Sequence, residues 1–171
     1  MKKIFLSILI TFLFTPSYAS PYKWESKENI VTISQKIDIN EKYLAQVFVL
    51  DYTLNSQCIA FASIISIANS KTLGKRIKED IYKSNKKGNQ LSFYVDDKEI
   101  KYQQEKIIKV EYDNGVEFGT LAPLSLIKSL EKSNGKLHVH LGETKLLRIP
   151  SSVGFSVENK KAYDFCVKNK R

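Results

Sequence analysis

The stretch from Cys58 to Ile67 contains no charged side chain, although 26% of the residues in the chain are charged. Small and large apolar residues alternate along it, which is typical of a strand shielded from water on both faces. We therefore expect a strand buried on both sides, with Cys58 at its start. This segment constrains the fold most, because both of its faces need cover.

Other runs rich in β-branched and aromatic residues predict further strands, and Ala45–Tyr52 is long enough to be a central one. Two connections have the composition of hairpin turns. They are Asp96-Asp97-Lys98 and Asp113-Asn114-Gly115, and we expect positive φ angles in the second. The remaining predicted strands are Ile30–Ile33, Leu91–Val95, Glu99–Gln103, Ile107–Tyr112, Val116–Phe118, Leu137–Leu141 and Leu146–Ile149.

Helical periodicity replaces this alternation in three segments. Ser70–Asn85 is an amphipathic helix with Ser70 as its cap. Pro123–Leu130 is a short helix that ends at Asn134-Gly135. Ser156 caps the last helix, whose inward positions follow the i, i+3, i+4 spacing. Those inward positions are Ala162, Phe165 and Cys166.

The first residues of the chain have the order of a secretory signal peptide: Lys2 and Lys3, an apolar run from Ile4 to Phe14, and the small-residue pattern Ser17-Tyr18-Ala19. The run is about half as long as the roughly 20 residues a membrane-spanning helix needs. An uncleaved anchor is the alternative. We expect cleavage of residues 1–19 and a periplasmic protein of a Gram-negative bacterium. Residues 20–171 then carry 25 basic and 18 acidic side chains, a formal charge of +7.

No internal repeat, linker or low-complexity segment divides residues 20–171. We expect a single α+β domain, mostly antiparallel sheet or sandwich, with two or three short helices and one disulfide. The disulfide joins Cys58 and Cys166, because cysteines of an exported chain are normally paired. Two buried free thiols are the alternative. A bond would attach the last helix to the buried strand.

The residues that could carry chemistry are few. His138 and His140 project from one face of a predicted strand, but a zinc site needs three or four ligands and these are the only two histidines. The acidic residues Asp96, Asp97, Glu99, Glu111 and Asp113 are typical of solvated turns. No nucleophile elbow, phosphate loop, dinucleotide fingerprint or zinc-protease motif is present. We therefore expect no enzyme, no metal and no cofactor.

A basic face is the more promising feature for binding. Lys75, Arg76, Lys78 and Lys83 lie on the predicted helix after Ser70, with Tyr82 among them. Such a face suits an acidic partner protein or an anionic membrane surface, and a solvated helix face is the alternative. Nucleic acid is not an expected partner, because no nucleic-acid-binding motif is present. Homo-oligomerisation is left open.

The stretch from Leu121 to Phe165 combines the short leucine-containing helix, a Gly135-Lys136 step, the alternating strand Leu137–Leu141 and a Ser-Ser-Val-Gly-Phe segment ending at Phe155, with Ala162 further on. In this it resembles the closing half of the invasion-associated locus B type of small periplasmic bacterial protein. That family's usual cysteine before the helix is absent, since Gly119 and Thr120 stand there. The resemblance implies a β-rich sandwich without catalytic residues that has envelope or host-interaction functions.

The function we expect is that of a non-enzymatic periplasmic binding or accessory protein. It would support an envelope-spanning secretion system or an interaction with a host, and small periplasmic accessory proteins of type IV secretion machines look similar in size and layout. The alternative is a periplasmic inhibitor or immunity protein against a cell-wall-degrading enzyme. Cationic lysozymes would be repelled by a charge of +7, so that alternative needs a neutral or acidic target.

Overall fold

The computed structural model describes residues 22–39, 41–53, 57–84, 90–104, 106–133, 135–151 and 153–170. Within these residues the chain forms ten strands in two antiparallel sheets and three helices, which confirms the predicted α+β class. The predicted signal peptide lies outside the described residues, as does Asn134. So do Asn55-Ser56 and Lys86-Lys87-Gly88-Asn89, two segments whose composition predicts a strand break and a turn.

The large sheet contains six strands in the order β1-β2-β3-β4-β8-β7, all antiparallel to their neighbours. Its two central strands, β3 and β4, correspond to the predicted central strand and the uncharged run. The bounds of the six strands are β1 Glu25–Lys27, β2 Ile30–Ile39, β3 Lys42–Tyr52, β4 Ala60–Ala68, β8 Gly115–Leu121 and β7 Ile108–Tyr112.

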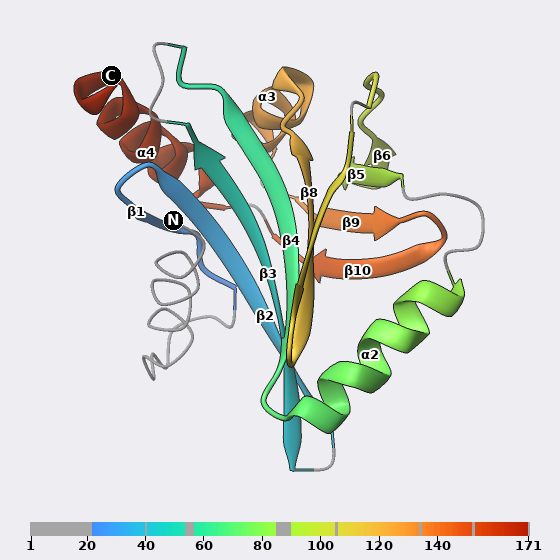
Figure 1. The fold of residues 1–171 in the computed structure, drawn as a ribbon. Coiled ribbons are helices and arrows are strands. Elements are labelled where there is room, and N and C mark those ends of the chain that lie inside the picture. The colour runs from blue at the N-terminus through green and yellow to red at the C-terminus, as the bar shows by residue number, and fades with distance from the viewer. Residues whose placement is uncertain are drawn as a thin grey trace.

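The small sheet contains four strands in the order β10-β9-β5-β6. Its strand β10 contacts β2, β3 and β4, and β5 contacts β8, so the small sheet packs against one face of the large sheet. Figure 1 shows β9 and β10 running at a steep angle to β3 and β4. The bounds are β5 Leu91–Val95, β6 Lys98–Glu99, β9 Leu137–Leu141 and β10 Thr144–Ile149.

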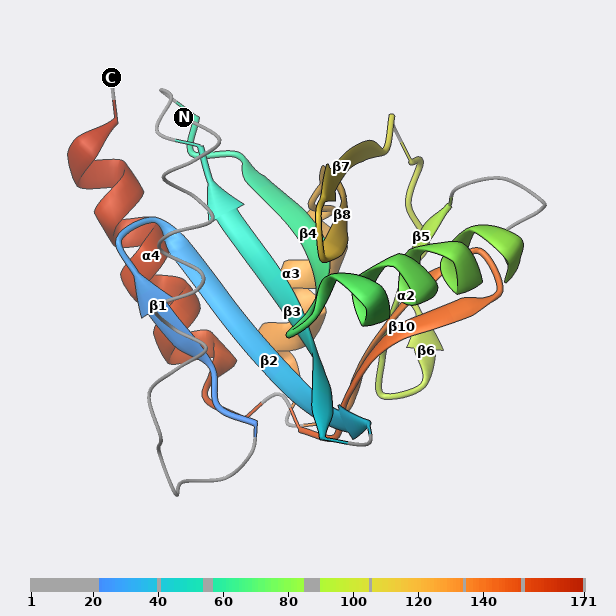
Figure 2. The same ribbon diagram turned by 60° about the horizontal axis from the view of Figure 1, so that its bottom comes forward.

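Three helices complete the described structure: α2 (Lys71–Ser84), α3 (Leu124–Lys132) and α4 (Phe155–Asn169). The predicted cap of α2 is confirmed, because the Ser70 hydroxyl accepts a hydrogen bond from the Leu73 backbone N–H at 3.3 Å. α2 contacts β4 and β8, whereas α4 contacts β1, β2 and β3. Figures 1 and 2 show α2 and α4 at opposite sides of the molecule.

The main core lies between the two sheets and the buried sides of the helices. We call the face of the large sheet that contributes to it the inner face. Aromatic rings connect its layers: Trp24 meets Phe155 of α4 at a centroid distance of 4.7 Å, and Phe48 of β3 meets Phe93 of the small sheet at 6.1 Å. Burial of each such side chain contributes about 1.5–3 kcal/mol, so this face holds the layers together.

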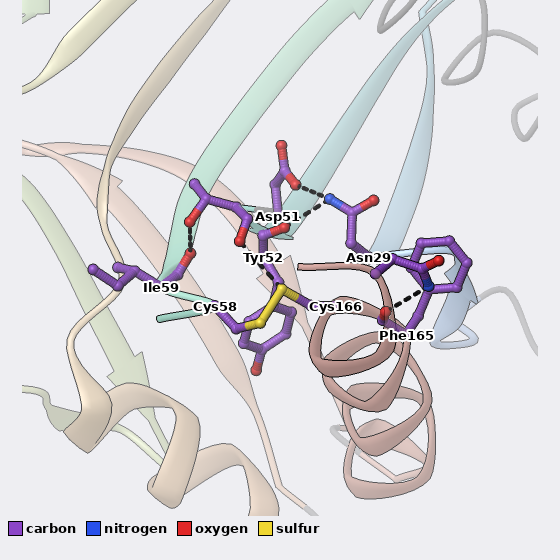
Figure 3. The surroundings of a disulfide bond; sticks show 9 residues. Asn29, Asp51, Tyr52, Cys58, Ile59, Phe165 and Cys166 are labelled. Atoms are coloured by element: carbon purple, nitrogen blue, oxygen red, sulfur yellow. Dashed lines mark hydrogen bonds between the residues drawn. A yellow bond between two sulfur atoms is a disulfide. The ribbon is translucent and has the colours of Figure 1, made fainter. Parts of the chain in front are cut away.

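The predicted disulfide is confirmed, with Cys58 and Cys166 joined and their α-carbons 5.9 Å apart. Figure 3 shows the bond between α4 and the segment that precedes β4. A hydrogen-bond chain supports the same junction. The Tyr52 hydroxyl donates to Asn159 Oδ1 at 2.6 Å, and Asn159 Nδ2 donates to Glu131 Oε1 at 3.0 Å. Burial raises the pKa of Tyr52 to about 12, which keeps its hydroxyl a donor at neutral pH.

Strand ends differ from the predictions. β4 begins at Ala60 rather than Cys58, since Cys58 has a φ of 47°, which an extended strand does not allow. β2 continues beyond Ile33 through polar residues to Ile39, because every residue of this extension pairs with β3. The predicted strand Glu99–Gln103 contributes only Glu99 to β6. The positive φ angles expected in the second hairpin lie instead in the first, at Asp96 and Asp97.

The last helix also differs from its prediction. It begins at Phe155 with Gly154 as its N-cap, in a left-handed conformation at φ 90°, and not at Ser156. Ala162 and Cys166 point inward as predicted, whereas Phe165 is only half-buried. Phe155 and Asn159 complete the buried side. The helix begins earlier than predicted because Phe155, its first residue, packs in the core beside Trp24.

Candidate functional site

The side of the large sheet that faces away from the small sheet, here called the outer face, carries a second and separate apolar cluster. Its buried members are Val47 and Val49 of β3 and Ile65 and Ile67 of β4. Ile30 and Tyr112, both half-buried, pack against them. All six side chains come from strands, whereas the buried apolar residues of α3 and α4 belong to the main core. In the described part of the chain, no helix contributes a side chain to this cluster.

The outer face becomes exposed toward β8 and β7. Phe61 lies opposite Leu121, and Ile108 lies opposite Gly119, so these side chains adjoin one another across three strands. Leu121 is 40% exposed and Ile108 is 50% exposed. The Phe61 ring lies so close to Gly119 that a β-carbon there would collide with it. Because Gly119 has no side chain, the Phe61 ring can lie over strand β8 at this position.

Two carboxylates border this apolar surface, Asp51 on β3 and Glu117 on β8. Asp51 Oδ1 accepts a hydrogen bond from Asn29 Nδ2 at 2.7 Å, and Glu117 Oε2 accepts one from the Tyr112 hydroxyl at 2.7 Å. Burial raises the pKa of Asp51, the hydrogen bond from Asn29 opposes this, and the charge of Glu117 adds to it. Within the described residues, neither carboxylate forms an ion pair.

The predicted basic face is less uniformly positive than its sequence indicates. Lys75, Arg76 and Lys83 are exposed on α2, but Lys78 is half-buried and donates to the Tyr112 carbonyl at 2.8 Å. Asp80 lies 4.0 Å from Arg76, and Glu79 is exposed on the same helix. Two of the four basic residues therefore have partners within the chain, and acidic neighbours reduce the field of the others.

The histidines lie as predicted on one side of β9, with ring centroids 6.5 Å apart. The Tyr94 ring lies 4.7 Å from that of His140, and Asp97 is 3.8 Å from His138 Nδ1. Burial, and then the charge of Lys145, lower the pKa of both histidines. The described residues contain no group of three or more His, Cys, Asp or Glu side chains that could hold a metal ion.

The acidic residues that could have formed a catalytic pair are spread over turns and strands and have separate partners. Asp96 Oδ1 accepts the Lys136 backbone N–H at 3.1 Å, and Asp97 pairs with the Lys136 ammonium at 3.1 Å. Glu111 pairs with Lys109 at 2.6 Å, and Asp113 pairs with Lys71 at 2.8 Å. Glu99 is exposed on β6. These acids connect neighbouring elements and do not converge.

No protein-family model, no curated protein and no solved structure matches this chain. No helix of the described part is long and apolar enough to cross a membrane.

The sequence prediction missed the outer face. A strand buried on both faces was expected at β4, and its residues are indeed buried on both sides. The signal that could have revealed an uncovered face is the pattern Ile108-Lys-Val-Glu-Tyr112, where apolar residues alternate with charges next to Gly119 and Leu121. Nothing in the sequence alone indicates that these positions adjoin β4.

Proposed function

We propose that the protein is a non-enzymatic binding or accessory protein of the bacterial periplasm that acts through contact with another envelope protein. The observation that supports this most is the outer face, where an apolar surface continues from the buried cluster to the exposed Ile108 and Leu121. Exposed apolar patches of this kind are typical of protein interaction sites. The role would be support of an envelope-spanning secretion system or of a host interaction.

The charges on this face narrow the chemistry of the partner. Asp51 and Glu117 border the apolar surface without an ion-pair partner in the described residues, and burial already disfavours the charge on Asp51. A docked apolar surface would desolvate both carboxylates further unless it brought a cation. The partner therefore presents apolar side chains together with a lysine or arginine. At the outer face, the two nearby carboxylates attract a partner's cation more strongly than the net positive charge of the chain repels it. The reason is that salt screens charges farther away than about 8–10 Å.

The test compares two double variants matched for exposure. Ile108→Ser with Leu121→Ser removes the apolar surface of the outer face, while Val157→Ser with Val167→Ser removes residues of 60% and 40% exposure from α4. We expect capture of a periplasmic partner by the tagged protein to be lost in the first variant and retained in the second. Equal capture by both variants would contradict the proposal.

Gene context separates the roles within this class. Neighbouring genes for a secretion machine favour the accessory role, whereas an adjacent gene for a cell-wall-degrading toxin favours the inhibitor role.

A further inference from the structure

The strand β7 forms one edge of the large sheet and pairs only with β8 within the described residues. An unpaired strand edge presents a row of free main-chain donors and acceptors, which another strand can use. Natural edges are usually protected by proline, by a bulge, by very short strands or by charged side chains, especially lysine. β7 does carry two charged residues, Lys109 and Glu111, but their opposite signs allow them to pair across an antiparallel copy of the same strand. β7 has five residues, contains no proline, and pairs with β8 in a continuous register without a bulge.

The two sides of β7 have different chemistry. Ile108, Val110 and Tyr112 alternate toward the outer face, and half of the Ile108 side chain is exposed. Lys109 and Glu111 project to the opposite side, where the Tyr82 hydroxyl donates to Glu111 at 2.9 Å. The edge therefore offers an apolar row on one side and one positive and one negative charge on the other.

The turn of the hairpin determines which main-chain groups are free. Tyr112 pairs with Gly115 across a two-residue turn, so the backbone groups of Tyr112 point toward β8. The alternation of an antiparallel ladder then turns the N–H and C=O groups of Lys109 and Glu111 away from β8. These two residues are the ones that an added strand would meet.

We propose that β7 pairs with β7 of a second copy of this chain, antiparallel and centred on Val110, to join two large sheets into one. In this register Lys109 lies opposite Glu111 of the partner subunit, and this pairing occurs twice because of the two-fold symmetry. Ile108 lies next to Tyr112 of the partner subunit, which covers the exposed isoleucine. The intrachain ion pair between Lys109 and Glu111, 2.6 Å apart, becomes part of a ring of four alternating charges.

The size of the contact makes this a weak dimer. Five residues from each chain bury far less surface than the roughly 1,200–2,000 Å² of a stable complex, so the dimer dissociates on dilution.

The unpaired part of the other edge of the large sheet, on β2, makes a matched comparison. β1 pairs only with Ile30–Thr32, and Lys36 and Asp38 flank Ile37 further along. There a symmetric pair centred on Ile37 would place Gln35 opposite Ile39, so the covered row would be interrupted by glutamine.

The test uses charge reversal and its rescue, read by sedimentation velocity of the purified protein over a concentration series. Lys109→Glu places two pairs of acids opposite each other in the dimer, and Glu111→Lys places two pairs of lysines there. We expect each single variant to weaken the dimer at least about tenfold. An equimolar mixture of the two variants restores opposite charges at both positions, and so does the double variant K109E with E111K. Both are therefore expected to dimerise like the unmodified chain.

Circular dichroism of each variant checks that the monomer remains folded, and Lys36→Glu on β2 is the matched control, expected to leave the dimer unchanged. A purified protein that stays monomeric at its highest soluble concentration would overturn the proposal. So would single variants that dimerise normally, or a mixture that shows no rescue. No other protein takes part in this measurement, so its failure would leave the partner-binding role of the outer face standing.

Discussion

The two faces of the large sheet are built from the same strands but have different surroundings. On the inner face, Ile64 of β4 packs in the main core with Phe48 and Phe118. On the outer face, its neighbour Ile65 packs in a cluster made only of strand residues. Both isoleucines are almost completely buried, at 0% and 1% exposure. Burial alone therefore does not show whether a second layer lies over a residue, and the layer decides how much the residue stabilises the fold.

The largest expected effect comes from the disulfide, which attaches α4 beside the inner face. Replacing Cys58 and Cys166 by Ala removes a cross-link over a separation of 108 residues. We expect a loss of about 2–5 kcal/mol in the free energy of unfolding, measured by urea denaturation. A loss below about 1 kcal/mol would mean that the hydrogen-bond chain from Tyr52 to Glu131 holds the helix by itself.

Adjacent isoleucines test the comparison directly. Ile64→Ala leaves a cavity between two layers, and we expect it to cost about 3–4 kcal/mol. Ile65→Ala leaves a gap that neighbouring side chains and water can fill, so about 1–2 kcal/mol is expected. Chemical denaturation of the two variants under the same conditions measures both. Equal losses would show that the outer face is as tightly packed as the inner one.

The two histidines on β9 of the small sheet are expected to make the stability of the fold depend on pH. Burial lowers the pKa of His138 and His140, so the unfolded chain binds protons more readily than the folded one. We expect stability to fall as the pH drops below the ordinary histidine pKa of about 6.5. Thermal melts from pH 7.5 to 5 follow this loss.

Replacing both histidines by Ala tests whether they cause this pH dependence. The variant should lose the pH dependence and about 1 kcal/mol per residue, with partner capture intact. If the histidine variant folds and still captures its partner but has lost its function, the strand carries chemistry and the non-enzymatic proposal is wrong.

Asp51 on the outer face is expected to affect the pH dependence of stability in the direction opposite to the histidines. Its pKa is raised in the fold, so its ionisation at neutral pH destabilises the folded chain. Asp51→Asn keeps an acceptor for Asn29, and we expect it to stabilise the protein by about 1 kcal/mol or less at pH 7. The gain should vanish below the ordinary aspartate pKa of about 3.9. Weaker partner capture by this stabilised variant would support a role for Asp51 in contacting a cation.

The smallest effect is expected on α2. Reversing the charges of Lys75 and Lys83, both exposed, should change stability by less than about 0.5 kcal/mol. If this face assists association with an acidic partner, the variant binds more weakly and its binding depends less on salt. Unchanged capture at low and moderate salt would make it a solvated helix face.

Local signals in the sequence predicted much of this fold. The uncharged run from Cys58 to Ile67 indicated a strand buried on both faces, Ser70 indicated the start of α2, and the spacing of Ala162 and Cys166 indicated the buried side of α4. The cysteine pair followed from the expected compartment and is present in the structure. These features depend on the residue itself and on neighbours within one or two turns, which is why a single sequence contains them.

Long-range pairing decided the rest. The polar half of β2 is a strand only because β3 lies beside it along its whole length. Phe155 enters the core because Trp24, far away in sequence, lies there, and this moves the start of α4 to Phe155, with Gly154 as its N-cap. The outer face and its β7 edge exist because β8 pairs with β4 rather than with another strand, and because the helices pack elsewhere. Alternation along a strand shows which residues share a face, but only the arrangement of the layers determines which face remains available for a partner.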